Sequence, residues 1–251
     1  IRREFRQLES AWYDGDKIRQ SRNRVDRLGF FSNVSLETQE VPGSQDQVDL
    51  LVTVAEKPTG SLSLGAGLSS SEGLGLTFGF KQDNAFGSGN SLGMDINTSK
   101  FNRSIGFNTT NPYFTDDGVS RTIEVAARSS KPYTDVDSYS LDTTSAALRF
   151  GVPFTDTDTV YFGVGVDRTT IVTGTGLPLA YQTYANQFGF TSSAIPLSVG
   201  WGRDTRDSAL VPTMGKLMRA TAEWSVAGEL RYLRATTQYQ HPTGMRQAGQ
   251  G

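Results

Sequence analysis

The side chains that could support catalysis or metal binding are few in this sequence. His241 is the single histidine; it follows the last segment with a strand pattern, and nothing near it pairs it with a nucleophilic serine. Asp204 and Asp207 could offer carboxylates to a calcium ion, but Arg203 and Arg206 stand beside them and would repel a cation. The pattern therefore predicts a charged turn, and we expect no catalytic residue and no metal site.

The glycines and the overall composition exclude further classes of function. The segment "GAGLSSSEG" contains Gly65, Gly67 and Gly73, but a strand pattern follows it, where a nucleotide-binding fingerprint requires a helix. The chain has no cysteine, which removes thiol catalysis and Cys-ligated metals. Its formal net charge of -2 gives no basic footprint for nucleic acid. We expect a protein that is not an enzyme, needs no cofactor and binds no nucleic acid.

The chemistry that remains is that of the backbone, and one segment is suited to it. "GSLSLGAGLSS" (Gly60 to Ser70) alternates with a period of two, which predicts a strand. One face of this strand would be apolar and the other nearly bare; the first carries Leu62, Leu64, Ala66 and Leu68, and the second carries Ser61, Ser63, Gly65 and Gly67. Glycine weakens a strand interior, which suits a strand that must detach and pair again. The alternative is that these small residues simply fill the interior of a barrel.

Strand patterns continue after Pro58, and we count about ten of them up to Gln240. No run approaches the ~20 apolar residues of a transmembrane helix, and only 36% of the residues are hydrophobic. A soluble sandwich would bury the apolar faces of these strands, whereas a membrane barrel would turn them to lipid. The longest connection, "VTGTGLPLAYQTYANQFGFTSSA", follows an odd-numbered strand. The turns after even-numbered strands carry the aromatic residues of an interfacial girdle, namely Phe86, Tyr113, Phe114 and Phe154. The pattern favours the membrane barrel.

The first 57 residues read as a small α+β module instead. Ile1, Phe5 and Leu8 share a helical face, and a second helix is predicted from an N-cap at Asp14 to a stop at Gly29. Two strands follow, joined by the turn "PGSQD". The second helix carries basic residues that form either a solvated face or a docking face for a partner or for anionic lipid head groups; they are Lys17, Arg19, Arg22, Arg24 and Arg27.

Several motifs resemble the POTRA-containing family of outer-membrane barrels that act as outer-membrane protein assembly factors. In the first 61 residues these motifs are "RRE.RQ.E.AW" (2–12), "RLGFF" (27–31), "VPGS.DQVD" (41–49) and "V.EK.TGS" (54–61), which are similar to the last POTRA module of the family. In the remainder they are "QDNAFGSGNSLG" (82–93), "TNPYFTDDGVS" (110–120) and "GWGRDTRDSALVPTMG" (200–215), which are similar to the family's periplasmic turns. The resemblance extends over essentially the whole chain.

The resemblance implies an incomplete POTRA module at 1–57, in the periplasm, and the N-terminal part of an outer-membrane barrel at 58–251. We expect a fragment, because the family's large inward-folding loop motif and closing strand are absent. The family implies that Gly60–Leu68 is a gate strand that templates incoming chains. It also implies three partners: unfolded outer-membrane proteins, assembly-complex lipoproteins and outer-membrane lipid. A POTRA-bearing secretion pore and a soluble β-sandwich binding module are the alternatives.

Overall fold

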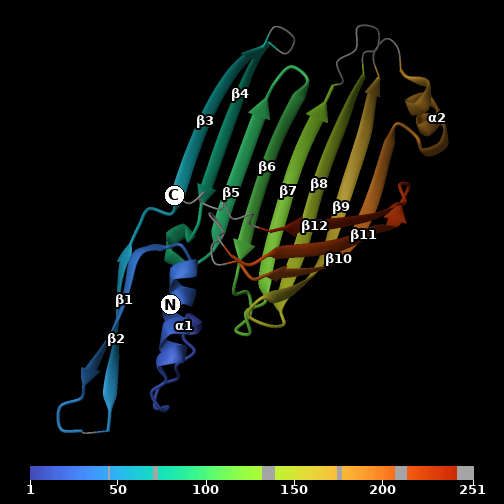
Figure 1. Cartoon of the computed structure of the whole chain (residues 1–251). Coiled ribbons are helices and arrows are strands. Elements are labelled where there is room, and N and C mark those ends of the chain that lie inside the picture. Colours follow the sequence, from blue (N-terminus) through green and yellow to red (C-terminus); the bar gives the residue numbers. More distant parts are fainter. Residues whose placement is uncertain (45, 70–72, 132–138, 174–176, 207–213, 242–251) are drawn as a thin grey trace, which may run out of the picture. The chain divides into compact units, whose positions relative to one another are not determined.

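The computed structural model describes residues 1–44, 46–69, 73–131, 139–173, 177–206 and 214–241. The chain divides into two compact units, Ile1–Gly60 and Ser61–Gly251. The first unit is α+β, and the second consists mainly of one antiparallel sheet (Figure 1). The predicted fold class, mainly β with a small α+β module in front, is confirmed.

The first unit is built around one helix packed on a hairpin. The helix α1 spans Gly15–Arg27, and the strands β1 (Phe31–Glu40) and β2 (Val48–Glu56) pair antiparallel. Asp14 caps the helix as predicted, since its side chain accepts hydrogen bonds from the N–H groups of Asp16 and Lys17. Val25 and Val34 are fully buried between helix and strand and form the centre of a small core.

The predicted helix at the start of the chain is wrong. Only a 3₁₀ turn, η1, forms there, at Arg2–Glu4, and Phe5 is already extended with φ -76° and ψ 128°. Contacts with α1 stabilise this turn: Glu4 is buried and forms an ion pair of 3.0 Å with Arg24 of α1. The backbone N–H of Arg6 also donates to the Ser21 hydroxyl, at 2.8 Å. These contacts with α1 fix an extended segment where apolar spacing alone suggests a helix.

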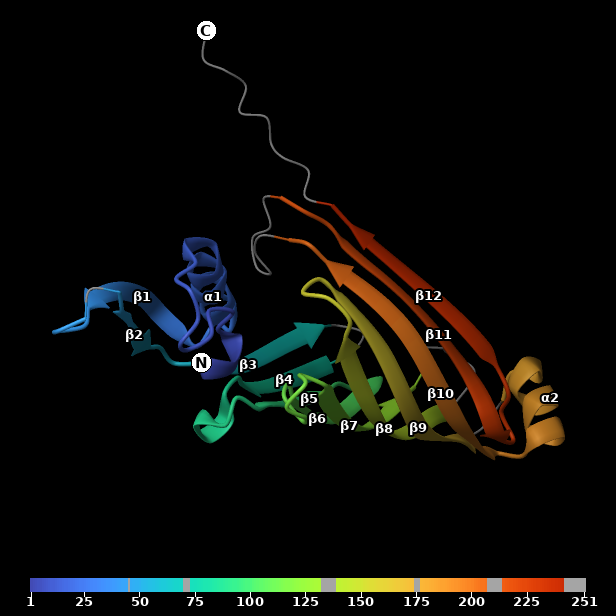
Figure 2. The same cartoon turned by 90° about the horizontal axis from the view of Figure 1, so that it is seen from below.

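The described residues of the second unit form ten strands in a meander, so each strand pairs with its neighbours in sequence. In chain order the strands are β3 (Gly60–Ser69), β4 (Gly73–Gln82), β5 (Ser91–Thr98), β6 (Asn102–Asn111), β7 (Ser120–Ser130), β8 (Tyr139–Pro153), β9 (Asp158–Thr173), β10 (Thr191–Asp204), β11 (Leu217–Gly228) and β12 (Leu233–Gln240). The strand count agrees with the sequence pattern. The sheet curves strongly, with β3 at one edge and β12 at the other (Figure 2). It is a single layer, so the alternative of a β-sandwich is wrong.

Two short helical elements lie between strands of the sheet in the part of the chain that the structure describes. The 3₁₀ turn η2 (Ala85–Gly87) lies between β4 and β5, and the helix α2 (Leu179–Phe188) lies between β9 and β10. The sequence pattern predicted a long loop where α2 lies. Pro178 precedes the helix and Gly189, at φ +84°, ends it, so ordinary helix-boundary residues are present there. No helix among the described residues is long and apolar enough to cross a membrane.

Candidate functional site

The strand β3 forms an open edge of the large sheet. It pairs with β4 on one side and has no strand partner on the other among the residues that the structure describes. All ten of its residues are exposed. In an antiparallel strand every second residue directs both its N–H and its C=O to the same side, so about five residues of β3 offer backbone groups to the open edge. The strand therefore presents a template for another strand.

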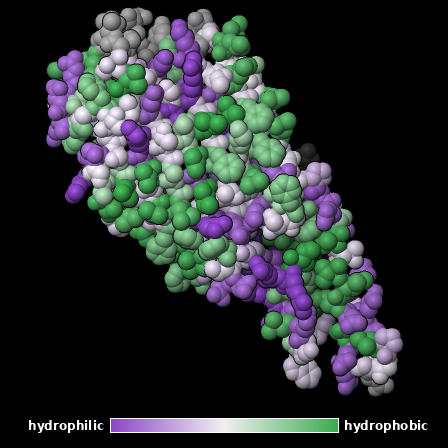
Figure 3. Space-filling view, turned by 180° about the vertical axis from the view of Figure 1, so that it is seen from behind, coloured by the Kyte–Doolittle hydropathy of each residue, from purple (hydrophilic) through white to green (hydrophobic). Residues whose placement is uncertain are grey.

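The strand register places a continuous row of apolar side chains on one side of the sheet, which we call the apolar face. One such row follows the cross-strand pairs from β4 to β9 and consists of Phe80, Met94, Phe107, Val125, Ala146 and Val166. Leu62 and Leu64 of β3 belong to the same face, and both are more than 60% exposed. Figure 3, which views the convex side of the sheet, shows hydrophobic side chains gathered across its middle.

Charged residues on the apolar face occur only near strand ends, within the strands that the structure describes. On β9 they are Asp158 and Arg168, with Val160, Phe162, Val164 and Val166 between them on the same face. Ten residue steps at ~3.4 Å correspond to about 34 Å along a strand, or about 26 Å along the axis of a barrel whose strands tilt by ~40°. The apolar band of outer-membrane barrels is about 25 Å tall. The charge-free height therefore matches the hydrocarbon core of a membrane.

The opposite side of the sheet, which we call the polar face, carries glycine, small polar residues and ion pairs. Arg149 of β8 binds Glu124 of β7, and Arg234 of β12 lies 3.5 Å from Glu223 of β11. The Tyr232 hydroxyl donates to the same Glu223 carboxylate, at 2.9 Å. Pairs of this kind suit a water-filled barrel interior.

The two faces of β3 follow this division. The Ser63 hydroxyl lies 2.5 Å from the position of a Cβ on Gly79, which places the odd-numbered residues of β3 on the polar face. A Cβ on Gly65 would lie 2.4 Å from the Thr77 hydroxyl oxygen, whereas one on Gly67 would meet nothing within 4 Å. Next to this edge the small side chains leave a hollow of about 260 Å³, lined by Ser61, Ser63, Gly79, Lys81, Gly93, Asp95 and Asn108 among others. Gly65 thus has a packing reason to be small, and Gly67 has none.

The aromatic residues predicted for the even-numbered turns lie at that end of the sheet and are largely exposed. Phe86 is completely exposed, on a turn where its own φ is +54°, and Phe154 is 71% exposed. Phe114 is 45% exposed, and Tyr113 is half-buried. Sequence reasoning missed Trp201 of β10, which lies on the apolar face near the same end. Its indole N–H donates to Asp158 at 3.1 Å, and this carboxylate also binds Arg203 at 2.8 and 3.0 Å.

The five basic residues predicted as a partner surface do not share one face of α1. At 3.6 residues per turn they spread around the helix. Arg24 binds the buried Glu4, Arg19 binds Asp16, and Arg27 is exposed. Lys17, Arg19 and Arg22 do come together, because all three line one cleft of about 750 Å³.

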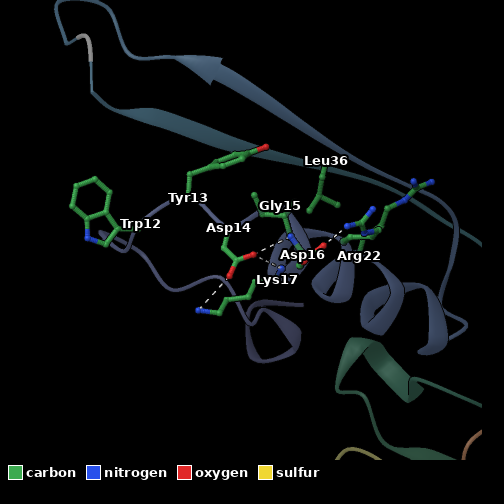
Figure 4. A pocket seen from close by; sticks show the side chains of 10 residues that line it. Trp12, Tyr13, Asp14, Gly15, Asp16, Lys17, Arg22 and Leu36 are labelled. Atoms are coloured by element: carbon green, nitrogen blue, oxygen red, sulfur yellow. Dashed lines mark hydrogen bonds and ion pairs between the residues drawn. The ribbon is translucent and has the colours of Figure 1, made fainter.

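This cleft also has an apolar part and lies within the first unit (Figure 4). Trp12, which is 96% exposed, and Tyr13 contribute aromatic rings, and Leu36 of β1 contributes an aliphatic side chain. Asp14 lies at its margin; the N–H of Lys17 donates to the carboxylate and lowers the pKa of Asp14. The combination of exposed aromatic and cationic side chains suits contact with another protein.

The residues considered for metal binding form local ion pairs instead. Asp204 binds the Arg206 guanidinium through two contacts of 2.9 and 2.7 Å. Asp207 lies outside the described residues, and His241 is exposed after β12. No group of three or more potential metal-binding side chains occurs among the residues that were placed.

An α+β unit followed by a curved one-layer sheet with an apolar convex face defines a transmembrane β-barrel protein of the POTRA-bearing class. Comparison with known families agrees. The Omp85 superfamily domain matches residues 84–247, and the POTRA family, described as surface antigen variable number repeat, matches residues 1–57. The chain belongs to the Omp85 superfamily.

Individual relatives extend this assignment. The chain is 38% identical over 248 residues to the outer membrane protein assembly factor BamA of Neisseria meningitidis, which covers 94% of this chain and 31% of that protein. It is 28% identical over 244 residues to BamA of Nitratidesulfovibrio vulgaris, covering 96% of this chain and 30% of that protein. The chain thus spans less than a third of the length of these relatives.

Two solved structures share the fold. BamA from Haemophilus ducreyi lacking POTRA domains 1–3 superimposes with a TM-score of 0.72 at 26% identity, covering 95% of this chain and 47% of that one. CdiB from Acinetobacter baumannii superimposes with a TM-score of 0.56 at 11% identity, covering 94% of this chain and 44% of that one. At 11% identity the second comparison shows a similar fold and nothing more.

Proposed function

We propose that this protein is an assembly factor for outer-membrane β-barrel proteins and that it is not an enzyme. The observation that carries the proposal is the open edge of β3, a fully exposed strand whose apolar face continues the band that would meet lipid. An unfolded client has unpaired backbone groups, each of which costs several kcal/mol in hydrocarbon. An open edge at membrane depth would satisfy those groups as the client pairs with it by β-augmentation.

The two faces of β3 give the pairing a defined register. A one-residue slip would turn the leucine side of the client–β3 ladder toward water, so register is specified wherever one face is apolar. Leu62, Leu64 and Leu68 would face lipid, and the small residues would face the barrel interior. A client strand with alternating residues of the same kind would continue both faces without a break.

The remaining parts take places consistent with this role. The large sheet would lie in the outer membrane and the POTRA unit in the periplasm. The cleft with Lys17, Arg19 and Arg22 would bind a lipoprotein of the assembly complex, because its exposed aromatic rings are joined there by cationic groups. The apolar face would contact outer-membrane lipid.

Site-directed crosslinking in the whole gene product tests the templating step. A cysteine at Leu64 should form a disulfide with a cysteine scanned along the terminal strand of a stalled client. Ile96→Cys on β5 is the matched control, since it lies on the same apolar face but on a strand that is paired on both sides. Equal crosslinking at both positions, or undiminished assembly when β3 is covalently locked, would contradict the proposal.

A secretion pore is the second candidate, because a POTRA unit followed by a curved sheet with an apolar convex face is also compatible with a barrel that threads a protein across the membrane. Depletion of the protein from cells distinguishes the two functions. Loss of many unrelated outer-membrane barrels indicates an assembly factor. Loss of one exported protein, with a large ion conductance of the purified protein, indicates a pore.

A further inference from the structure

Two arginines lie on the apolar face at the end of the sheet where the even-numbered turns are found. Arg203 of β10 pairs with Asp158, and Arg121 of β7 lies opposite Phe150 of β8. A cation at this place costs free energy unless it has a partner. Arg203 has one, because Asp158 holds it through two hydrogen bonds.

Arg121 has no carboxylate partner among the residues that the structure describes. Its guanidinium carbon instead lies 4.4 Å from the centroid of the Phe114 ring. Stacking on an aromatic ring covers one face of the guanidinium and leaves its N–H groups free at the edges. The guanidinium group is thus oriented by the ring and half-buried.

The turn between β6 and β7 holds Phe114 in this position. The Phe114 N–H donates to the carbonyl of Val119 at 2.8 Å, and the Phe114 ring lies 5.9 Å from that of Phe150. Gly118, at φ +83°, allows the chain to reverse between these residues. The ring that supports Arg121 is therefore fixed by the backbone and by a neighbouring strand.

We propose that Arg121, stacked on Phe114, binds the phosphate of a phospholipid head group at this end of the barrel. A guanidinium matches a phosphate through two parallel N–H···O contacts. The neighbouring side chains favour a lipid as the ligand. Ile123 and Val125 follow Arg121 along β7 on the apolar face, where acyl chains would lie. The inference rests on the proposed membrane location and adds a lipid site that would fix the depth of β6 and β7.

Native mass spectrometry of the whole gene product with phosphatidylglycerol tests this site. The Arg121→Gln variant should bind the tightest lipid about fivefold more weakly, the loss expected for one interfacial cation. Arg128→Gln is the matched control, because Arg128 lies on the same strand and on the polar face. Arg121→Lys should restore most of the binding, and diacylglycerol, which has no phosphate, should not distinguish the variants.

Equal phosphatidylglycerol retention by Arg121→Gln and the unaltered protein would overturn the lipid site. Unchanged lipid binding by Arg121→Gln together with weaker binding of a purified envelope lipoprotein would also overturn it, by assigning Arg121 to a protein partner. Failure of the unaltered protein to enter lipid vesicles would instead refute the membrane location on which both proposals depend. If Arg121→Gln retains lipid unchanged while client assembly is normal, the lipid site is refuted and the proposed function is not.

Discussion

The two glycines in the middle of β3 should respond in opposite ways to the same added methyl group. A Cβ at Gly67 has open space around it, and its φ is not in the left-handed region. Gly67→Ala should therefore stabilise the paired strand by about 0.5–1 kcal/mol, the usual difference between glycine and alanine in a strand interior. That corresponds to strand openings that are about two- to fivefold rarer.

Gly65→Ala should have the opposite effect. The new Cβ would lie 2.4 Å from the Thr77 hydroxyl oxygen, closer than real contacts allow. The expected cost is about 1 kcal/mol, at the low end for overpacking because both residues are at an edge of the sheet and Thr77 can turn. The double variant Gly65→Ala/Thr77→Ala removes the oxygen that clashes and should recover this loss.

Amide hydrogen exchange of β3 and β4 in the whole gene product measures strand opening, and the rate of client folding in vesicles measures function. If β3 must detach to accept a client, Gly67→Ala should slow exchange and slow assembly by similar factors. Slower exchange with an unchanged assembly rate would refute the idea that opening of β3 limits assembly. The glycine would then be an ordinary small residue of the barrel interior.

Three further changes follow from the same structure. Asp14→Ala should lower the melting temperature of the first unit by several degrees, as measured by circular dichroism, because the helix cap is lost. The pKa of Asp14 is lowered in the folded state. The stabilisation by this cap is therefore complete above about pH 4 and disappears as the pH falls through the folded pKa. Asp158→Ala should lower the thermal stability of the barrel, because it leaves Arg203 without its partner on the apolar face, and Asp158→Asn should lower it less. Val125→Arg should cost about 2–4 kcal/mol of folding free energy in lipid, whereas Ala126→Arg on the polar face should cost far less; equal costs in denaturant titration would exclude a lipid-facing role for the apolar face.

The period-two patterns predicted the large sheet well, because each strand meets a different medium on its two sides. This holds even for β4, where Phe78 and Phe80 alternate with Thr77 and Gly79. The N-cap at Asp14 and the helix end at Gly29 were also predicted correctly, since both depend on local backbone chemistry. The predicted boundary between the two regions, near Pro58, remains a prediction, although the compact units also meet at Gly60.

Two failures of sequence reasoning involve partners distant in the chain. Glu4 is held by Arg24, so the segment around it is extended although its apolar spacing suggests a helix. The spread of the basic residues around α1 is different in kind, because it follows from the 3.6-residue period of the helix and from a local pair between Arg19 and Asp16. Asp158 and Arg203 are 45 residues apart and gave no local signal of their pairing. Strand register could have found this pair, but only after the pairing of β9 with β10 was known.

The position of β3 within the sheet bears on whether it can open. The register between β8 and β9 runs from Tyr139 to Pro153, whereas that between β4 and β5 runs only from Leu76 to Gln82. The pairing of β8 with β9, in the middle of the sheet, is therefore longer than the pairing of β4 with β5. Local opening occurs where few hydrogen bonds and few buried contacts must be broken. Among the described residues β3 has a strand partner on one side only, exposes every residue and carries glycine at 67 without a packing need, so fewer contacts hold it than hold an inner strand of the sheet.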